Sequence, residues 1–249
     1  MSPKSRAERA RQAVSFRRGL LRWYRRHGRD LPWRHTRDPY HIVVSEFMLQ
    51  QTQVSRVEAY YHRFLERYPT VHTLAAAPPA AVRESWEGLG YYRRAANLHR
   101  LAQAVVDEHG GVMPSDPVVL AKLPGVGRYT AGAVACFAYE KVAATVDTNV
   151  ARVLRRVFHP RLAGRALSKR IWRTALEILP SQGKRAWHVN QALMELGALI
   201  CTARVAKCGE CPVRGACRTG RRRASGYATI APPISATRAN TPATDPTTR

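Results

Sequence analysis

The chain has 249 residues, of which 45% are hydrophobic, enough to bury one large core or two modest ones. No run of about 18 apolar residues is present, and the N-terminus lacks the apolar core of a secretory signal. The composition therefore excludes a helical membrane span, and we expect no membrane partner and a cytoplasmic location.

The charge of the chain is strongly positive, since 41 Lys and Arg residues against 17 Asp and Glu residues give a net charge of +24. Such a charge attracts polyanions by long-range steering and by counterion release. Nucleic acid is the interpretation that we favour, with the protein held near the nucleoid. An anionic membrane attracts the same composition, and a basic surface without a partner is the simpler alternative.

Apolar residues recur at helical spacing along nearly the whole chain, as at Leu98, Leu101 and Val105, and no convincing alternating strand is found. Prolines punctuate the sequence into helices of about 8 to 18 residues. The pattern predicts an all-α fold. Residues 1–14 are polar and basic, so we expect them to be mobile.

The first element with chemical interest is the mostly apolar helical stretch from Ile42 to Leu49, which carries Glu46. Burial in such a stretch would raise the pKa of the carboxyl group and keep it protonated for donation. An exposed helix carboxylate is the alternative for an isolated Glu.

A sharp turn is predicted at Leu123-Pro-Gly-Val-Gly127, between a helix that ends near Leu123 and one that begins near Tyr129. The glycines Gly125 and Gly127 let the backbone bend and expose N–H groups, while Val126 plugs the turn into the core. The turn predicts an anion site at a helix N-terminus. A plain connection between two helices is the alternative.

Asp147 comes just before a helix predicted from Val150 to Val157. Helix capping is its simplest role. Capping is compatible with chemistry, because a helix N-terminus favours the ionised carboxylate.

Four of the five cysteines, Cys201, Cys208, Cys211 and Cys217, have the spacing C-x6-C-x2-C-x5-C. Four thiolates in one loop suit either tetrahedral zinc or a [4Fe–4S] cluster, so the spacing leaves both open. Cys136 lies apart in an apolar stretch and is expected in the core.

From Arg218 the chain is Arg-rich and then becomes a Pro, Thr and Ala tail, which we expect to be disordered. Arg221, Arg222 and Arg223 either contact DNA phosphates or are solvated.

The turn, extended to Ala133, closely resembles the helix-hairpin-helix of the endonuclease III and MutY superfamily of DNA glycosylases. Four further segments resemble MutY-type adenine DNA glycosylases in the same order: Ser45-Glu-Phe-Met-Leu-Gln-Gln-Thr-Gln-Val54, Trp86-Glu-Gly-Leu-Gly-Tyr-Tyr92, Val146-Asp-Thr-Asn-Val150 and Asn190-Gln-Ala-Leu-Met-Glu-Leu-Gly197. Together they span about residues 16–217.

The resemblance implies a two-lobed glycosylase core at residues 15–217. A six-helix lobe with the hairpin would occupy about residues 30–145, and residues 15–29 with 146–217 would form an iron–sulfur lobe. The cysteine loop would carry a [4Fe–4S] cluster that positions DNA. The partner would be double-stranded DNA containing a mispair, bound by a monomer.

The resemblance also implies roles for single residues. An extruded adenine would be protonated at N7 by Glu46, and Asp147, oriented by Asn149, would stabilise or trap the sugar cation. Bifunctional relatives carry Lys where this chain has Tyr129, so base removal without strand cleavage is expected, with the phenol near the sugar.

Contacts to DNA and to the base complete the expected site. Leu123, Gly125, Val126 and Gly127 would form the phosphate-binding hairpin. Gln51 would fill the gap in the base stack, Tyr91 would wedge beside the opposite guanine, Glu195 would contact the adenine, and Arg34 would line its pocket or steady Glu46. As alternatives, Tyr91 and Trp33 could be core aromatics and Arg34 a surface cation.

Two departures from the family qualify these expectations. Thr148 stands where many members have Gly, which narrows the backbone freedom at the sugar site. The sequence also ends about 30 residues after the cysteine loop, where longer members continue into a domain that inspects 8-oxoguanine, so weakened lesion discrimination is expected.

Two other functions stay open. A thymine or uracil glycosylase that acts opposite guanine would share a short chain and Tyr at position 129, although Gln50, Gln51 and Glu46 favour adenine. A non-catalytic DNA-binding module would keep the hairpin and the cluster, but the presence of both Glu46 and Asp147 argues against it.

Overall fold

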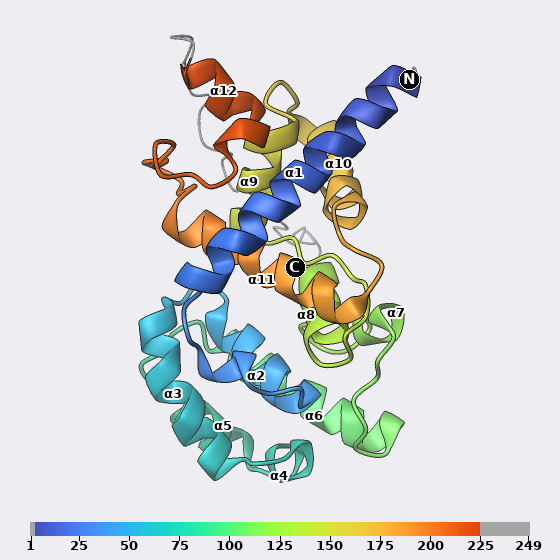
Figure 1. Cartoon of the computed structure of the whole chain (residues 1–249). Helices are drawn as coiled ribbons and strands as arrows, with labels where there is room; N and C mark the ends of the chain where they lie inside the picture. Colours follow the sequence, from blue (N-terminus) through green and yellow to red (C-terminus); the bar gives the residue numbers. More distant parts are fainter. Residues whose placement is uncertain (1–2, 225–249) are drawn as a thin grey trace, which may run out of the picture.

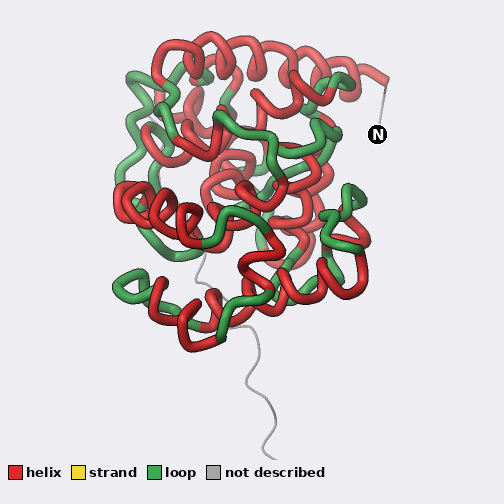
Figure 2. Tube along the Cα trace, turned by 90° about the horizontal axis from the view of Figure 1, so that it is seen from below, coloured by secondary structure: helices red, strands yellow, loops and turns green. Residues whose placement is uncertain are grey.

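Figure 1 shows a computed structural model of the chain, which describes residues 3–224. Within that range the structure is helical without a strand, and Figure 2 shows helices joined by loops throughout. The predicted all-α class is therefore confirmed. The helices are α1 (Pro3–His27), α2 (Pro39–Leu49), α3 (Val54–Arg67), α4 (Val71–Ala75), α5 (Pro79–Ser85), α6 (Arg93–His109), α7 (Pro117–Leu120), α8 (Arg128–Phe137), α9 (Thr148–Phe158), α10 (Gly164–Glu177), α11 (Gly183–Leu199) and α12 (Arg218–Ala224), with 3-10 turns η1 (Pro32–Arg34) and η2 (Arg214–Ala216).

The helices pack around two hydrophobic cores. The first core takes its side chains from Leu31 to Phe137, with Trp187 added from α11. The second combines Phe16, Leu20 and Trp23 of α1 with side chains from the stretch 144–217. In Figure 1, α2 to α6 form the lower lobe, while α1, α9, α10 and α12 belong to the upper lobe. The two cores support a division near residues 30 and 145, which remains our proposal.

The N-terminal segment differs from the sequence-based expectation. Residues 3–14, which we expected to be mobile, form the first half of α1, and the side-chain amide of Gln12 donates to the Ala216 carbonyl at 2.7 Å. Arg, Ala, Glu and Gln are good helix formers, and their summed propensity extends the helix that buries Phe16 and Leu20.

The C-terminal side of the cysteine loop also differs from the expectation. Residues 218–224 form α12, which packs on α9, so the Arg-rich segment begins as a helix. Thr219 donates its hydroxyl to the Arg156 carbonyl at 2.6 Å, which ties α12 to the second core. The tail expected to be disordered, residues 225–249, lies outside the described residues.

Candidate active site

Glu46 lies on α2, surrounded by the first core, and only 6% of its surface is exposed. Burial raises the pKa of this carboxyl to about 7, the nearby charge of Asp147 acts in the same direction, and a hydrogen bond with Tyr129 acts against both. The carboxyl group is therefore substantially protonated near neutral pH, as a proton donor requires. The apolar stretch from Ile42 to Leu49 predicted this burial.

Asp147 caps the N-terminus of α9. One carboxylate oxygen, Oδ1, accepts from the backbone N–H of Val150 at 2.6 Å, and the other, Oδ2, accepts from Nδ2 of Asn149 at 3.0 Å. The helix α9 starts at Thr148, two residues before the predicted start. Asp147 is its N-cap, as predicted. The site thus places Glu46, with its raised pKa, beside a carboxylate that accepts two N–H bonds at a helix N-terminus.

A chain of hydrogen bonds runs from Asp147 toward the cysteine loop. Oδ1 of Asn149 accepts from the guanidinium of Arg152 at 2.6 Å. The same guanidinium donates to the Gly197 carbonyl and to the Cys201 carbonyl, both at 2.8 Å. Arg152 was missed in the sequence, where only its spacing of one helical turn from Asn149 could have indicated it.

Tyr129 stands in the first turn of α8 and hydrogen-bonds the Glu46 carboxyl. Burial, followed by the charges of Glu46 and Asp147, raises the pKa of its phenol well above the ordinary value, so the group stays neutral. The structure thus brings Glu46, Tyr129 and Asp147 into one electrostatic cluster, although they belong to α2, α8 and the start of α9.

The predicted hairpin precedes Tyr129. Gly125 has φ of +75°, and a side chain there would meet Cβ of Asn97 at 2.7 Å, so both the turn and the close packing require glycine. Leu123 and Val126 are buried, whereas Gly125 and Gly127 are exposed at the turn. Gly127 is the N-cap of α8, so the turn lies at a helix N-terminus, where free backbone N–H groups can bind an anion.

A second carboxylate, Glu195 of α11, is fully buried and bound by two arginines. Arg29 donates to Oε1 at 2.7 Å and Arg34 donates to the same oxygen at 2.8 Å. Burial acts to raise the pKa of Glu195, but the hydrogen bonds from Arg29 and Arg34 outweigh it and the pKa is lowered. Glu195 is therefore a carboxylate at neutral pH, in contrast to Glu46.

The side chain of Arg34 is held from three sides. It also donates to Oε1 of Gln191 at 2.9 Å and to the carbonyl of Arg29 at 2.6 Å. The surface alternative is wrong for Arg34, because its side chain is 8% exposed. Its hydrogen bonds go to α11 and to the Arg29 carbonyl, and none of them goes to Glu46. Arg29 and Gln191 were missed in the sequence. An arginine just after a helix gives no signal in so basic a chain, and Gln191 lies 157 residues from its partner Arg34.

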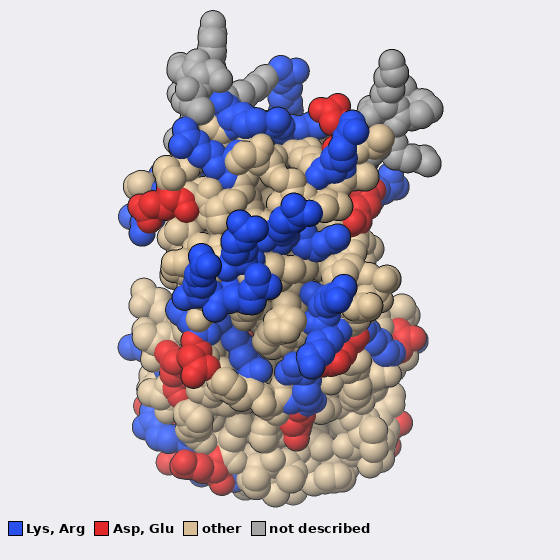
Figure 3. All heavy atoms as spheres, viewed as in Figure 1, with Lys and Arg blue, Asp and Glu red and all other residues tan. Residues whose placement is uncertain are grey.

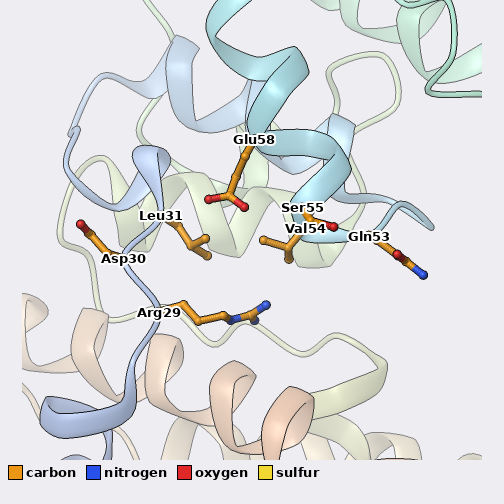
Figure 4. Close-up of a pocket in the computed structure, with 7 residues that line it drawn as sticks. All are labelled: Arg29, Asp30, Leu31, Gln53, Val54, Ser55 and Glu58. Atoms are coloured by element: carbon orange, nitrogen blue, oxygen red, sulfur yellow. The ribbon is translucent and has the colours of Figure 1, made fainter.

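Arg29 also lines a pocket of about 540 Å³ (Figure 4). Its lining residues come from the segment after α1 and from the start of α3: Arg29, Asp30, Leu31, Gln53, Val54, Ser55 and Glu58. Arg29 thus both lines the pocket and binds Glu195. The lining of the pocket combines two apolar side chains, Leu31 and Val54, with five polar or charged ones.

Gln51 and Tyr91 lie on two turns with left-handed backbone, at φ of +56° and +49°. Tyr91 is 60% exposed, so the alternative of a core aromatic is wrong for it. The same alternative holds for Trp33, which is buried and packs its ring edge against Tyr61. Two exposed side chains on fixed turns suit contact with a partner surface.

The four cysteines of the loop lie in one electrostatic neighbourhood. Burial, together with electrostatic interaction with the other three cysteines, raises the pKa of Cys211 to about 11. Sγ of Cys217 accepts from the backbone N–H of Gly220 at 3.2 Å, and Sγ of Cys201 accepts from Arg156 at 3.4 Å.

Among residues 3–224 no group of three or more His, Cys, Asp or Glu side chains is arranged to hold a metal ion. The donor set nevertheless fits a four-thiolate group, since all four sulfurs interact and two already accept N–H bonds of the kind that stabilise metal-bound thiolates. Cys136 lies apart in the first core, as expected.

Positive charge covers much of the face in Figure 3, where Lys and Arg side chains run along α1. Within residues 7–27 of that helix the exposed arginines are Arg9, Arg11, Arg18, Arg22, Arg25 and Arg26. None of the helices in the described part of the chain has the length and apolar character needed to cross a bilayer.

The chain is similar to known proteins of base excision DNA repair. Residues 44–175 match the family described as HhH-GPD superfamily base excision DNA repair protein. The adenine DNA glycosylase of Mycobacterium tuberculosis (strain ATCC 25618 / H37Rv) is 48% identical over 78% of this chain and 64% of its own length. The Homo sapiens adenine DNA glycosylase is 42% identical over 85% of this chain and 40% of its own length. The chain thus spans less than two thirds of these relatives.

Solved structures give the same picture. A thermostable thymine-DNA glycosylase has a TM-score of 0.79 and 32% identity, covering 85% of this chain and 98% of its own. A trapped endonuclease III–DNA covalent intermediate has a TM-score of 0.73 and 27% identity, covering 86% and 98%. These likenesses confirm the predicted helix-hairpin-helix glycosylase architecture.

Proposed function

Because this chain belongs to the HhH-GPD superfamily of base excision DNA repair proteins, we propose that it hydrolyses the N-glycosidic bond of adenine mispaired in double-stranded DNA. The observation that carries the proposal is the pair of neighbouring carboxyl groups in unlike surroundings: Glu46 is buried with a raised pKa, and Asp147 accepts N–H bonds at the start of α9. The names of its curated relatives support adenine as the base.

The chemistry follows from that pair. A base stacked in a duplex is out of reach, so the nucleotide must first be extruded into the protein. Glu46, protonated below about pH 7, donates its proton to the leaving purine. The carboxylate of Asp147 then faces the cationic sugar and stabilises or traps it until water completes the hydrolysis.

Base recognition falls to the polar groups around the pocket. Arg29 and Leu31 line it, and Arg29 links the pocket to the buried charges of Glu195 and Arg34. Glu195 is an ionised acceptor whose side chain is 1% exposed and bound by Arg29 and Arg34, so it would act on adenine through these two guanidinium groups. Removal of Arg29 or Arg34 would leave a buried charge with one partner fewer.

The DNA backbone is bound by the basic surface and by the hairpin. Exposed N–H groups around Gly125 and Gly127 hold a phosphate at the N-terminus of α8. The thiols of Cys201, Cys208, Cys211 and Cys217 would hold a [4Fe–4S] cluster. Bound there, the cluster supplies a rigid fold for the basic loop that carries Arg204 and Lys207.

Thymine or uracil opposite guanine is the second candidate substrate, and the similarity to a thymine-DNA glycosylase over 98% of that chain favours it. Departure of a pyrimidine does not use protonation at a purine N7. The two substrates can therefore be separated by the dependence on Glu46.

The test is a single-turnover assay on duplexes with A:G, A:8-oxoguanine, T:G and U:G mispairs, with Glu46→Gln beside the unaltered protein. We expect the unaltered protein to release adenine and Glu46→Gln to release none. Faster release of thymine or uracil, retained in Glu46→Gln, would overturn adenine as the substrate.

Borohydride added during turnover should trap little protein on DNA, because the phenol of Tyr129 cannot form an imine. Efficient trapping would reveal a lysine that acts as a lyase.

A further inference from the structure

Arg94, in the first turn of α6, is a buried cation that joins two separate turns. It is 7% exposed, and its guanidinium donates only to backbone carbonyl groups. Three of these end α2 and begin the following turn, and three lie on the loop before α6: Phe47 (3.0 Å), Met48 (2.7 Å), Gln50 (2.5 Å), Leu89 (3.2 Å), Gly90 (3.0 Å) and Tyr91 (3.4 Å).

Each of these turns ends in a residue with an unfavourable backbone conformation. Gln51 has φ of +56° and Tyr91 has φ of +49°, a region that residues with a side chain rarely adopt. Such a conformation persists only where surrounding contacts hold it. The carbonyls bound by Arg94 include that of Gln50, directly before Gln51, and that of Tyr91 itself.

No carboxylate pairs with Arg94 in the part of the chain that the structure describes. The carbonyl groups therefore take the place of water around the buried charge. The ring centroids of Tyr91 and Trp86 lie 5.4 and 5.6 Å from the guanidinium carbon. Only a planar fork with five N–H groups can bond to both turns at once, whereas the ammonium of lysine is a single point.

We infer that Arg94 is a positioning residue that fixes the turns of Gln51 and Tyr91 relative to each other before DNA binds. The exposed side chains on these turns then enter the duplex as one preformed unit. Base extrusion therefore does not carry the entropy cost of ordering the two loops. The inference rests on the proposed function, because it takes Gln51 and Tyr91 as the residues that enter the base stack.

The experiment measures base extrusion apart from base release. All variants carry Glu46→Gln, and the duplex has 2-aminopurine, a fluorescent adenine analogue, opposite guanine. Its fluorescence rises when the base leaves the stack. The variants are Arg94→Met, Arg94→Lys, Gln51→Ala and Tyr91→Ala, with Arg94→Met combined in turn with each Ala substitution. Arg100→Met is the matched control, since Arg100 is an exposed arginine of the same helix whose side chain donates to Asn97.

The expected result is a loss of coupling between the turns. Gln51→Ala and Tyr91→Ala should each lower the extrusion equilibrium about tenfold, within the range of a lost stacking contact. Arg94→Met should do the same, and the double variants should lose much less than the product of the single losses. Arg94→Lys should resemble Arg94→Met, and Arg100→Met should resemble the parent protein.

Several outcomes would overturn the inference. Independent losses in the double variants would mean that Arg94 does not act through these turns, and full extrusion by Arg94→Lys would mean that charge alone matters. If Arg94→Met does not fold, the same double variants made with Arg94→Lys decide. Unchanged extrusion in Gln51→Ala and Tyr91→Ala would remove the basis of the inference, while failure of adenine release by the unaltered protein would instead reject the proposed function.

Discussion

The phenol of Tyr129 hydrogen-bonds the carboxyl group of Glu46, linking the first turn of α8 to the buried face of α2. Burial raises the pKa of Glu46 and this hydrogen bond lowers it, so the value of about 7 is a balance of opposing effects. The position of that balance sets the pH range in which the proton is available.

Replacement of Tyr129 by Phe removes the contribution that lowers the pKa of Glu46. Its pKa should rise above about 7, and the protonated form should persist to higher pH. The basic limb of the profile of single-turnover rate against pH is therefore expected to move to higher pH. Tyr139→Phe is the control, because that phenol bonds the Met113 carbonyl away from the site. A limb that stays in place would contradict the assigned role of Glu46.

Asp147→Asn keeps the shape and the helix cap but removes the charge. Base release should fall by about a hundredfold, the scale of one lost electrostatic stabiliser, while binding to mispaired DNA persists. Asp116→Asn is a matched control, since Asp116 caps α7 with a 2.7 Å bond to the Val118 N–H. A normal single-turnover rate in Asp147→Asn would show that this carboxylate does not face the reacting sugar.

Glu46 should lower the stability of the protein at alkaline pH. Its pKa is raised on folding from 4.5 to about 7, so its contribution to stability is fully present below pH 4.5 and is lost as the pH rises through about 7. At pH 8 the buried charge should cost about 3 kcal/mol. Urea unfolding of Glu46→Gln should thus show a gain in stability relative to the unaltered protein that grows from pH 5 to pH 8. A gain independent of pH would argue against a buried carboxyl with a raised pKa.

The sequence predicted those parts of the fold and site that depend on local pattern. Helical spacing of apolar residues predicted the helices, two glycines around Val126 predicted the turn before α8, and Asp147 was recognised as a cap. Each of these signals lies within a few residues, so it survives without knowledge of the tertiary structure.

The arginines could not be predicted in this way. Arg29, Arg94 and Arg152 each hold a group far away along the chain, by as many as 166 residues for Arg29 and Glu195. With 41 basic residues, a sequence gives no reason to prefer one arginine over another. Their roles depend on which carboxylates and carbonyl groups the packing of the helices buries beside them.

The cysteine loop predicts a metal content. Purified protein should contain about four irons and four labile sulfides per chain, as a [4Fe–4S] cluster requires. Cys211→Ser should lose cluster and DNA affinity together, since the metal-held loop presents its basic residues. Cys136→Ala, in the first core, should keep both. Stoichiometric zinc without sulfide would refute the cluster.

The second core joins the two ends of the described chain, and this has a consequence for how the protein is made. Contacts of the first core fall almost entirely within residues 31–137, so that lobe can begin to fold as soon as this stretch leaves the ribosome. The helix α1 is synthesised first, yet its apolar face meets residues of the stretch 144–217, and Gln12 bonds a carbonyl 204 residues later. Phe16 and Leu20 therefore stay without most of their native cover until α9 and α11 have been synthesised. In that interval α1 is the part of the nascent chain most exposed to aggregation and most in need of a chaperone.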